Sequence, residues 1–573
     1  MQKLRSRIIG LLVMATMLVA ACAPSAPTER VGSPGQAPAE PPRAPKTLTA
    51  TALREPASLH LDLSPGTTTS GSNQPYLIVH NYLTVRNEKW TILPQLAEEL
   101  ISIEKGTWRV NADGTMDTTW KLRPNIKWHD GVPFTADDLV FSLGVYKDPE
   151  VPNRSGNVLR SMESAEAPDP RTFVLHWSSV YVDAARASGL IPLPRHLAEA
   201  PFKSDKAGFL NSPLLGPEFV GLGAYKLSRW EPGVQMEFAR FDDYYLGRPP
   251  FDTVTLKFIG DPNGMVAAIL SGNADVVLPL GVDTEVAEDL KRRWEGTGNQ
   301  VTGNVTGAMR FIIIQHRPEY ARPQNGFTNR LVRQAFMQAT DRQAVAELAT
   351  LGYSQAMDGW FPPTHQLAPL VQSSIPQYPL DFNAAQQKLA QAGWVKNAQG
   401  ELVSQTNGER FDFELRSFQE GPAEKNLATI ADGWQKVGAR VEQFVVPGAL
   451  NSDAEYRNTL PGGSITGQIW DMMYTSALDS RVIAGPLNRW NGSNRAGYNN
   501  PRVDDLYDKL AITVNPDERV ALHKTLLQEV FGDAAYIPLY WEYSVTLALK
   551  NVRGVGGLVD NSSTWNIFEW NKD

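Results

Sequence analysis

The segment of residues 124–148, with the run just before it, constrains the fold of this chain more than any other stretch. Residues 118–122 alternate between polar and apolar side chains and predict a strand, and the Asp-Gly pair at 130–131 predicts a tight turn. Thr135 followed by Asp138 predicts a capping box at the start of a helix. The segment therefore predicts a strand, a turn and a capped helix, and it contains no catalytic constellation.

The length of 573 residues exceeds a single ordinary hydrophobic core, so two or three domains are expected. Apolar residues make up 42% of the chain and charged residues 20%, which is typical of a globular protein. The formal net charge of −8 argues against nucleic acid and anionic membrane surfaces as partners. The count of 15 tryptophans favours a protein with aromatic-lined surfaces.

The N-terminus has the pattern of a bacterial signal peptide. Three basic residues within the first seven positions precede an apolar run at residues 8–19, which is too short for a comfortable membrane span. The sequence Val-Ala-Ala-Cys at residues 19–22 resembles a lipobox, in which signal peptidase cuts before Cys22 and the thiol carries a diacylglycerol. The sequence therefore predicts a signal peptide over residues 1–21, followed by a lipidated Cys22 and a disordered tether over residues 22–47.

Cys22 is the single cysteine of the chain, so neither an intramolecular disulfide nor a cysteine metal site is possible. Acyl chains contribute about 0.8 kcal/mol per buried CH₂ group, so a multiply acylated terminus would hold the protein firmly at a membrane. Residues 23–46 are rich in Pro, Ala, Gly and Ser and cannot build a core, which is why a tether is expected. The alternative is an ordinary signal peptide with an incidental cysteine.

Several short motifs follow one another through the chain in a characteristic order. Residues 122–143 read LRPNIKWHDGVPFTADDLVFSL, residues 220–227 read VGLGAYKL, residues 329–342 read NRLVRQAFMQATDR, and residues 537–540 read IPLY. Together these motifs resemble those of the family 5 extracytoplasmic solute-binding proteins. These are the receptors of ABC importers for oligopeptides, dipeptides, nickel and some oligosaccharides.

Helix and strand signals alternate through most of the body, so the predicted fold class is α/β. The resemblance implies a two-lobed, periplasmic-binding-protein-like fold, in which hinge strands join the lobes and a cleft closes between them. It also implies an inserted domain on the first lobe. The implied division assigns lobe I to residues 48–85, 210–310 and 537–573, the inserted domain to residues 86–209, and lobe II to residues 311–536.

Sequence motifs for catalysis are missing from the chain. It contains no P-loop, no complete dinucleotide-binding glycine motif, no H-E-x-x-H zinc motif and no G-x-S-x-G nucleophile motif. The eight histidines are scattered without metal-ligand spacing, and His129 is expected to serve its own turn. The sequence therefore predicts a protein that is not an enzyme and uses neither a cofactor nor a metal, and a secreted hydrolase is disfavoured.

The resemblance also implies where a ligand contacts the chain. Peptide-binding members carry a late segment, G-W-x-x-D-Y-x-D-P, whose first aspartate binds the peptide α-amino group. Asp479 is the corresponding residue here, although the tryptophan and the Asp-Pro pair of that segment are absent. Trp490 and Tyr498 lie in a polar aromatic loop and are expected to face the cleft. Trp360 and Phe361, before a Pro-Pro pair, are expected at its rim.

The leading hypothesis from the sequence is a lipid-anchored receptor that captures peptides or peptide-like solutes and delivers them to the permease and ATPase of an ABC importer. An oligosaccharide receptor is an alternative, favoured by the tryptophan count and the altered aspartate segment. A receptor-fold sensor or chaperone without a transport partner is another. We expect a monomer in the periplasmic space or on the outer face of the cell membrane, attached only through its lipid and without a nucleic acid partner.

Overall fold

A large mixed sheet joins two parts of the chain, and its strand order departs from the order of the sequence. The structure, a computed structural model, describes residues 44–573 apart from 61–62, 64–71, 152–155, 187–189, 419–421, 451–452, 472–476 and 561. The predicted signal peptide and Cys22 lie outside these residues, and Pro45–Asp573 forms one compact unit. Within the described residues ten strands form this sheet, in the order β16 (Arg440–Val446), β15 (Asp412–Phe418), β17 (Gly463–Ile469), β12 (Gln300–Ile314), β18 (Tyr536–Ala548), β11 (Val276–Val277), β1 (Thr47–Ala52), β10 (Thr253–Phe258), β9 (Gln235–Arg240) and β8 (Tyr225–Glu231).

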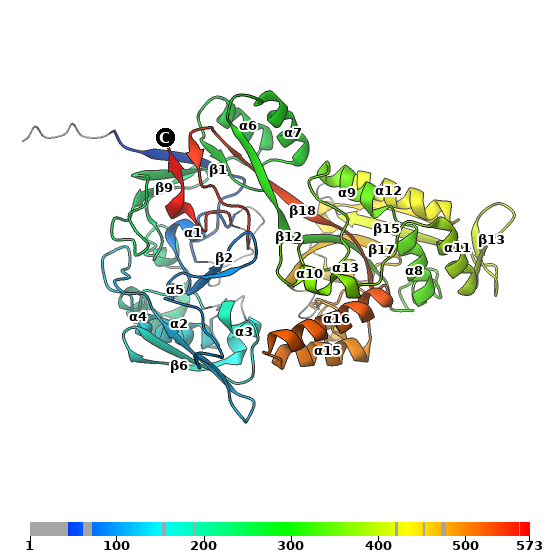
Figure 1. Ribbon diagram of the computed structural model, residues 1–573, viewed down its shortest axis with the longest axis horizontal. Coiled ribbons are helices and arrows are strands. Elements are labelled where there is room, and N and C mark those ends of the chain that lie inside the picture. Colours follow the sequence, from blue (N-terminus) through cyan, green and yellow to red (C-terminus); the bar gives the residue numbers. More distant parts are fainter. Residues whose placement is uncertain are drawn as a thin grey trace, which may run out of the picture. The chain divides into compact units, whose positions relative to one another are not determined.

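Two long antiparallel strands, β12 and β18, run side by side through the middle of this sheet (Figure 1). β18 also pairs with β11, and β12 also pairs with β17, so the two strands belong to both parts of the sheet. Their ladder is interrupted by a register shift between Val305 and Met309. We call residues 44–303 and 545–573 the first lobe, and residues 309–541 the second lobe.

The second lobe packs helices against its part of the sheet around an aromatic core. Phe327, Phe336, Phe411 and Trp434 are buried there, and the rings of Phe327 and Phe413 meet edge to face with centroids 4.8 Å apart. The helices are α8 (Arg330–Gln338), α9 (Arg342–Thr350), α10 (Ala368–Val371), α11 (Phe382–Gln391), α12 (Ala423–Lys436), α13 (Ala454–Asn458), α15 (Pro501–Ile512) and α16 (Pro516–Gly532), with a hairpin of β13 (Trp394–Lys396) and β14 (Leu402–Ser404).

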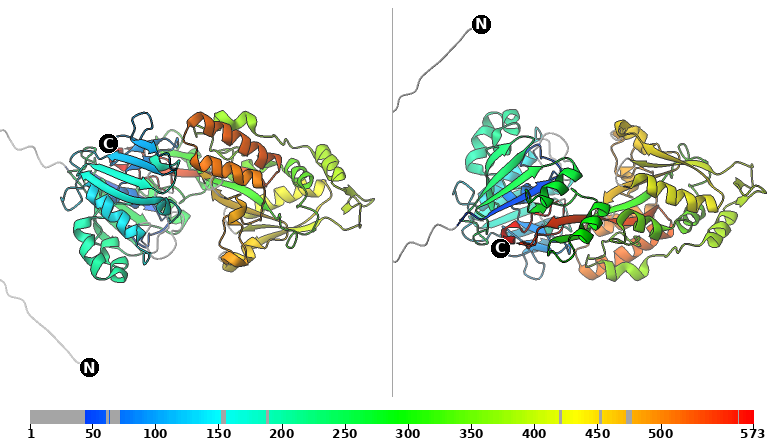
Figure 2. Two further views of the ribbon diagram at one scale, coloured as in Figure 1. Left: turned by 90° about the horizontal axis from the view of Figure 1, so that it is seen from below. Right: turned by 90° about the horizontal axis from the view of Figure 1, so that it is seen from above.

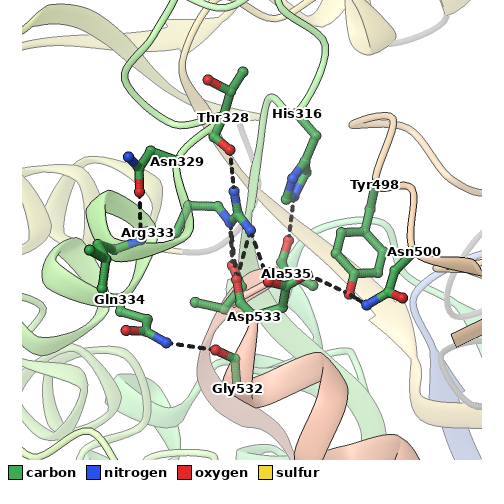
Figure 3. Close-up of polar contacts among 12 residues, drawn as sticks. His316, Thr328, Asn329, Arg333, Gln334, Tyr498, Asn500, Gly532, Asp533 and Ala535 are labelled. Carbon is green, nitrogen blue, oxygen red and sulfur yellow. Dashed lines mark hydrogen bonds and ion pairs between the residues drawn. The ribbon is translucent and has the colours of Figure 1, made fainter. Parts of the chain in front are cut away.

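Arg333 of α8 caps the C-terminal end of α16 in the interior of the second lobe (Figure 3). Its side chain is buried, and its guanidinium donates to the carbonyl oxygens of Asp533 and Ala534, just beyond α16. It also donates to the carbonyl oxygens of Phe327 and Thr328 before α8. The last carbonyls of a helix have no intrahelical donor, so a buried cation can satisfy them. Arg333 therefore ties two helices together mainly through backbone groups, and its guanidinium also lies 3.5 Å from the Asp533 carboxylate.

The first lobe contains a second sheet, whose described strands are β4 (Trp108–Val110), β5 (Met116–Lys121), β7 (Thr172–Trp177) and β6 (Met162–Asp169), in that order. Its core buries Trp120, Trp128 and Trp177. Both views of Figure 2 show the red C-terminal end beside the blue and cyan segments, and Trp570 is buried in the core of this lobe. The other helices and strands of the lobe are α1 (Tyr76–Val79), α2 (Ala136–Lys147), α3 (Gly156–Ser161), α4 (Arg195–Ser204), α5 (Lys206–Leu210), α6 (Pro262–Leu270), α7 (Thr284–Arg293), β2 (Thr84–Arg86), β3 (Ile92–Pro94), β19 (Val552–Arg553) and β20 (Asn571–Lys572).

The capping box predicted at the start of α2 is confirmed. The Thr135 N–H donates to the Asp138 carboxylate at 2.9 Å. The same carboxylate accepts from the Arg195 N–H at 3.0 Å, where α4 begins, and from the indole N–H of Trp128 at 3.4 Å. Burial raises the pKa of Asp138, against these hydrogen bonds. Asp138 thus joins the turn, its own helix and a helix from elsewhere in the sequence.

His129 is expected from the sequence to serve its own turn, and the structure shows that its ring also bonds a loop far away in the sequence. Its Nδ1 accepts from the Gly221 N–H at 3.2 Å, and its Nε2 donates to the Gly223 carbonyl at 3.0 Å. A Cβ would lie 1.9 Å from the Val79 carbonyl oxygen at Gly221, and 2.3 Å from the Ile78 oxygen at Gly223. Only glycine therefore fits at residues 221 and 223. The hydrogen bonds of His129 join the motif of residues 122–143 to the motif of residues 220–227.

Among the helices that the structure describes, none is both long and apolar enough to cross a membrane.

Candidate functional site

A hairpin of the first lobe presents an arginine and a tryptophan to the second lobe. Its strands β2 and β3 pair antiparallel, and the Asn87 side chain closes the turn by accepting from two backbone N–H groups at 3.0 Å. Trp90, in that turn, has a φ of 62°, a left-handed conformation that is costly for a tryptophan. The Arg86 guanidinium lies 4.9 Å from the centroid of the Trp90 ring, within range of a cation–π interaction.

Gly307, at the interruption of β12, makes room for the Trp90 ring. A Cβ at this position would lie 2.2 Å from Trp90 Cη2 and 2.9 Å from Trp470 Cδ1. The rings of Trp90 and Trp470 meet edge to face, with centroids 5.7 Å apart. Trp90 is 6% exposed and belongs to the buried core of the second lobe. A glycine of the connecting strands therefore permits this contact between the lobes.

The second lobe supplies an aromatic wall opposite the hairpin. Phe361 stacks on His365 with centroids 5.1 Å apart and meets Trp470 at 5.5 Å. His365 and Trp470 are 4.7 Å apart, and His523 meets Phe361 edge to face at 5.2 Å. Packing of this kind fixes the orientation of each ring, so the wall is pre-formed.

A cavity of about 130 Å³ lies between the hairpin and the aromatic wall. At about 30 Å³ for each water molecule in the liquid, this is room for roughly four waters, which a small group of a ligand could replace. None of the described lining residues carries a neutral amide or hydroxyl side chain, so the polar groups of the lining are charged groups, imidazoles and the indole N–H groups of Trp90 and Trp470. The lining residues are Arg86, Trp90, Ile92, Asp183, Arg186, Phe361, His365, Leu367, Trp470, Arg519 and His523.

Two arginines at the cavity share two aspartates. Arg86 Nε donates to Asp560 Oδ2 at 2.9 Å, and a second nitrogen of Arg86 pairs with Asp560 Oδ1. Arg186 Nη1 donates to Asp471 Oδ2 at 2.8 Å, and its Nη2 lies 3.4 Å from Asp560 Oδ1. Asp471 Oδ2 is also 3.7 Å from Arg86. Because Asp471 alone of these four belongs to the second lobe, its ion pairs cross between the lobes.

Burial and the nearby arginines shift the pKa values of Asp560, His365 and His523. Burial raises the pKa of Asp560, but Arg86 and Arg186 outweigh it, so the pKa is lowered overall. Burial lowers the pKa of His365 to about 4, helped by Arg86, and that of His523 to about 3, helped by Arg519. Near neutral pH the cavity therefore presents two neutral imidazoles, and Arg86 and Arg186 lie against the ionised carboxylate of Asp560.

Phe361 is the predicted site residue that the structure places in the wall of this cavity. Its neighbour Trp360 is fully buried in the core of the second lobe. Asp479 begins the short helix η5 (Ser480–Val482), where its carboxylate accepts from the Arg481 N–H at 2.8 Å and pairs with the Arg481 guanidinium at 2.7 Å. Trp360 and Asp479 do not line the 130 Å³ cavity.

Trp490 and Tyr498 lie elsewhere in the second lobe. The Trp490 ring faces Tyr320 at 6.2 Å and the Arg317 guanidinium at 5.9 Å. The Tyr498 hydroxyl donates to Asp533 Oδ2 at 3.0 Å (Figure 3), and its ring borders a separate cavity of about 20 Å³. These two residues and Phe361 are therefore not brought together, and their contact with a ligand stays a prediction.

Sequence reasoning missed Arg86, Trp90, Arg186 and Asp471. The available signal was weak: a charged residue ends a strand-like run at Arg86, and an acid directly follows Trp470 at the end of β17. Such residues usually lie on a solvated face. These four residues come together because the two lobes pack against each other, which the sequence around each residue does not show.

The comparisons with known proteins point to one family. The model of the bacterial extracellular solute-binding proteins, family 5 Middle, matches residues 91–477. The oligopeptide-binding protein AppA of Bacillus subtilis is 23% identical over 493 residues, which cover 83% of this chain and 83% of AppA. The glutathione-binding protein GsiB of Escherichia coli (strain K12) is 26% identical over 455 residues, covering 78% of this chain and 82% of GsiB.

A solved structure of the Bacillus subtilis AppA, in complex with a nonapeptide, aligns with a TM-score of 0.67 at 21% identity. The alignment covers 92% of this chain and 100% of that chain. The predicted two-lobed α/β fold is therefore confirmed. The family match spans more than half of the sequence and confirms a solute receptor outside the cytoplasm rather than an enzyme. The chain belongs to the bacterial extracellular solute-binding proteins of family 5.

Proposed function

We propose that this protein is the receptor of an ABC importer and captures peptides or peptide-like solutes outside the membrane for delivery to the permease and ATPase. The observation that carries the proposal is the cavity between the lobes, with aromatic rings from both lobes and an ion pair that crosses between them. A ligand held there excludes water, so a few charged contacts carry much of the affinity.

The chemistry of the lining favours a peptide over an oligosaccharide. Peptide termini are ionised and need charged partners when they are buried, whereas sugar hydroxyls are usually met by amides, hydroxyls and carboxylates. The described lining supplies three arginines and one aspartate beside tryptophan and phenylalanine, which suits charged groups next to apolar side chains. The names of the relatives, oligopeptide-binding and glutathione-binding, point in the same direction.

The experiment is native mass spectrometry on protein purified without refolding, followed by titration calorimetry with what co-purifies. Co-purified peptides that bind again to the emptied protein support the proposal. Co-purified glycans would assign the oligosaccharide function instead. A protein that binds neither class, and whose gene has no neighbouring permease and ATPase, would contradict a transport role and favour a sensor or chaperone.

The ligand contacts predicted from the sequence are part of this proposal. Phe361 is proposed to touch the ligand from the cavity wall. For Asp479, Trp490, Tyr498 and Trp360 the proposal requires a second subsite, since their contacts here are with the protein itself. Asp479→Ala tests this: loss of peptide affinity only when the peptide amine is free would place Asp479 at that amine, and unchanged affinity would remove it.

We also propose that residues 1–21 are a signal peptide and that a lipidated Cys22 anchors a monomer through the tether 22–47. The assignment of residues 86–209 to a separate inserted domain is proposed with it. Cys22→Ser tests the anchor, because the variant should move from the membrane fraction to the soluble fraction, while Ala23→Ser should not. Membrane association that survives Cys22→Ser would contradict lipidation.

A further inference from the structure

In the arginine–aspartate cluster, Asp471 alone belongs to the second lobe and can therefore separate from the other members. Arg86 and Asp560 lie in the same lobe and hold each other through two contacts. Arg186 Nη2 lies 3.4 Å from Oδ1 of the same Asp560. Its Nη1 points toward Asp471 of the other lobe at 2.8 Å. When the lobes separate, as a cleft must to admit a ligand, Asp471 is the carboxylate that moves away from both guanidinium groups.

The place that Asp471 occupies is shaped for a carboxylate. A guanidinium has only donors, so whatever replaces Asp471 there must accept hydrogen bonds and gains most if it is anionic. A ligand ammonium cannot take this place, because it would lie beside two ionised arginines. Arg86 stays paired with Asp560 when Asp471 leaves, whereas Arg186 loses its 2.8 Å contact and keeps the longer one of 3.4 Å to Asp560, so Arg186 gains most from a replacement carboxylate.

The other side chains that line the cavity determine which ligand groups can bind next to that carboxylate. Trp90, Phe361 and Trp470 provide apolar rings next to the arginines. His365 and His523 are neutral near pH 7 because burial lowers their pKa values, so the positive charge comes from the arginines. Asp183 also lines the cavity and limits the total positive charge, which disfavours a ligand with several anionic groups at this place.

We propose that Asp471 stands in for a carboxylate of the ligand: a bound peptide places its carboxylate on Arg186 and Arg86, displaces Asp471, and seats the adjoining apolar side chain against Trp90 and Phe361. The proposal rests on the proposed peptide receptor function and adds its selectivity. The receptor discriminates in favour of peptides with a free carboxylate, and the displaced Asp471 acts as a built-in competitor.

The test uses a mixed pentapeptide library of Ala, Val, Leu and Phe, in which the C-terminus is the single carboxylate. It is prepared in four forms: both ends free, N-acetylated, C-amidated, and blocked at both ends. Binding to the full-length mature protein is measured by competition in native mass spectrometry. We expect C-amidation to weaken binding about tenfold to hundredfold, as for the loss of a charged hydrogen bond.

Two variants locate the effect. Arg186→Gln should lower the difference between free and amidated peptides to about threefold or less, because the charged donor is lost. Asp471→Asn should strengthen binding of peptides with a free carboxylate by several-fold, because the competing charge is removed, whatever the state of the N-terminus. Arg229→Gln is the matched control, since Arg229 is 58% exposed on β8 and pairs with Glu231 and Glu237. Thermal unfolding confirms that each variant is folded.

Each contrary result has a distinct meaning. Equal binding of free and amidated peptides by the wild-type protein would overturn the proposed replacement of Asp471 by a ligand carboxylate. It would not contradict the function as a peptide receptor. If Arg186→Gln weakens all four forms equally, the arginine is merely structural and the proposal fails. If Asp471→Asn weakens only peptides with a free amine, Asp471 binds the ammonium and the proposal also fails. Failure of every form to bind would overturn the receptor function as well.

Discussion

Arg333 and the pair Arg86 and Arg186 have different kinds of partner in this protein. Arg333 donates to backbone carbonyls at the ends of α8 and α16, and the carboxylate nearest to it, that of Asp533 at 3.5 Å, belongs to the same lobe. Arg86 and Arg186 instead pair with carboxylates on side chains, and one of these, Asp471, belongs to the other lobe. Both arrangements satisfy a guanidinium. They differ in whether the partner can leave without unfolding the protein.

The difference separates scaffold from candidate binding site. A carbonyl at a helix end stays in place as long as the helix exists, so Arg333 contributes to the stability of the second lobe. A carboxylate on the opposite lobe leaves whenever the cleft opens, so the Arg186–Asp471 contact is exchangeable. Four measurements test this distinction, and they follow in order of decreasing expected effect.

Arg333→Met should lower the free energy of unfolding by about 3–5 kcal/mol, because it leaves the buried carbonyl oxygens of Phe327, Thr328, Asp533 and Ala534 without their donor. Urea unfolding measures it, with Arg440→Met as the control, since Arg440 is 70% exposed in its side chain. A loss below about 1 kcal/mol would contradict the scaffold role.

Gly307→Ala should cost about 1–3 kcal/mol of stability, because the new Cβ would lie 2.2 Å from Trp90 and the packed rings must shift. It should also weaken ligand binding, since Trp90 borders the cavity. Gly485→Ala is the control: a Cβ there meets nothing within 4 Å. Thermal unfolding and peptide titration measure both effects, and a Gly307→Ala protein with normal stability would show that Trp90 is not confined.

His316 makes the Arg333 region sensitive to acid. Burial, with Arg333 nearby, lowers its pKa from 6.5 to about 3 in the folded state. The unfolded chain therefore binds the extra proton first, and stability falls as pH decreases below 6.5, by up to about 1.4 kcal/mol per pH unit. His316→Gln should reduce that slope between about pH 6 and pH 5 by about 1 kcal/mol per unit in urea unfolding. An unchanged slope would mean that the ring is protonated in the fold.

Arg186→Gln should change the free energy of unfolding by about 1 kcal/mol or less, because its side chain is 27% exposed and its ion pairs are partly solvated. The same variant is expected to lose the preference for a ligand carboxylate, so stability and binding should separate at this position. Chemical denaturation of the wild-type protein and the variant, in the same buffer without peptide, measures the difference. A loss comparable to that of Arg333→Met would remove the distinction between the two groups.

Much of the local structure could be predicted from short-range patterns. The capping box of Thr135 and Asp138 lies within four residues, and the turn before it is marked by an Asp-Gly pair. The pattern of motifs identified the family, and with it the two lobes. The candidate site was harder to predict: of the five residues expected to contact a ligand, Phe361 lines the cavity, whereas Asp479 pairs with its neighbour Arg481.

Local caps and turns could be predicted from the sequence because they depend on side chains within a few residues of one another, and the order of the motifs along the chain identified the family and with it the class of fold. The tertiary structure alone decided that Arg186 meets Asp471 across 285 residues and that Arg86 meets Asp560 across 474. Those meetings depend on the register of β12 against β18 and on the space that Gly307 leaves for Trp90. The sequence around a charged residue shows only that the residue is polar. Its partner depends on how the two lobes are joined.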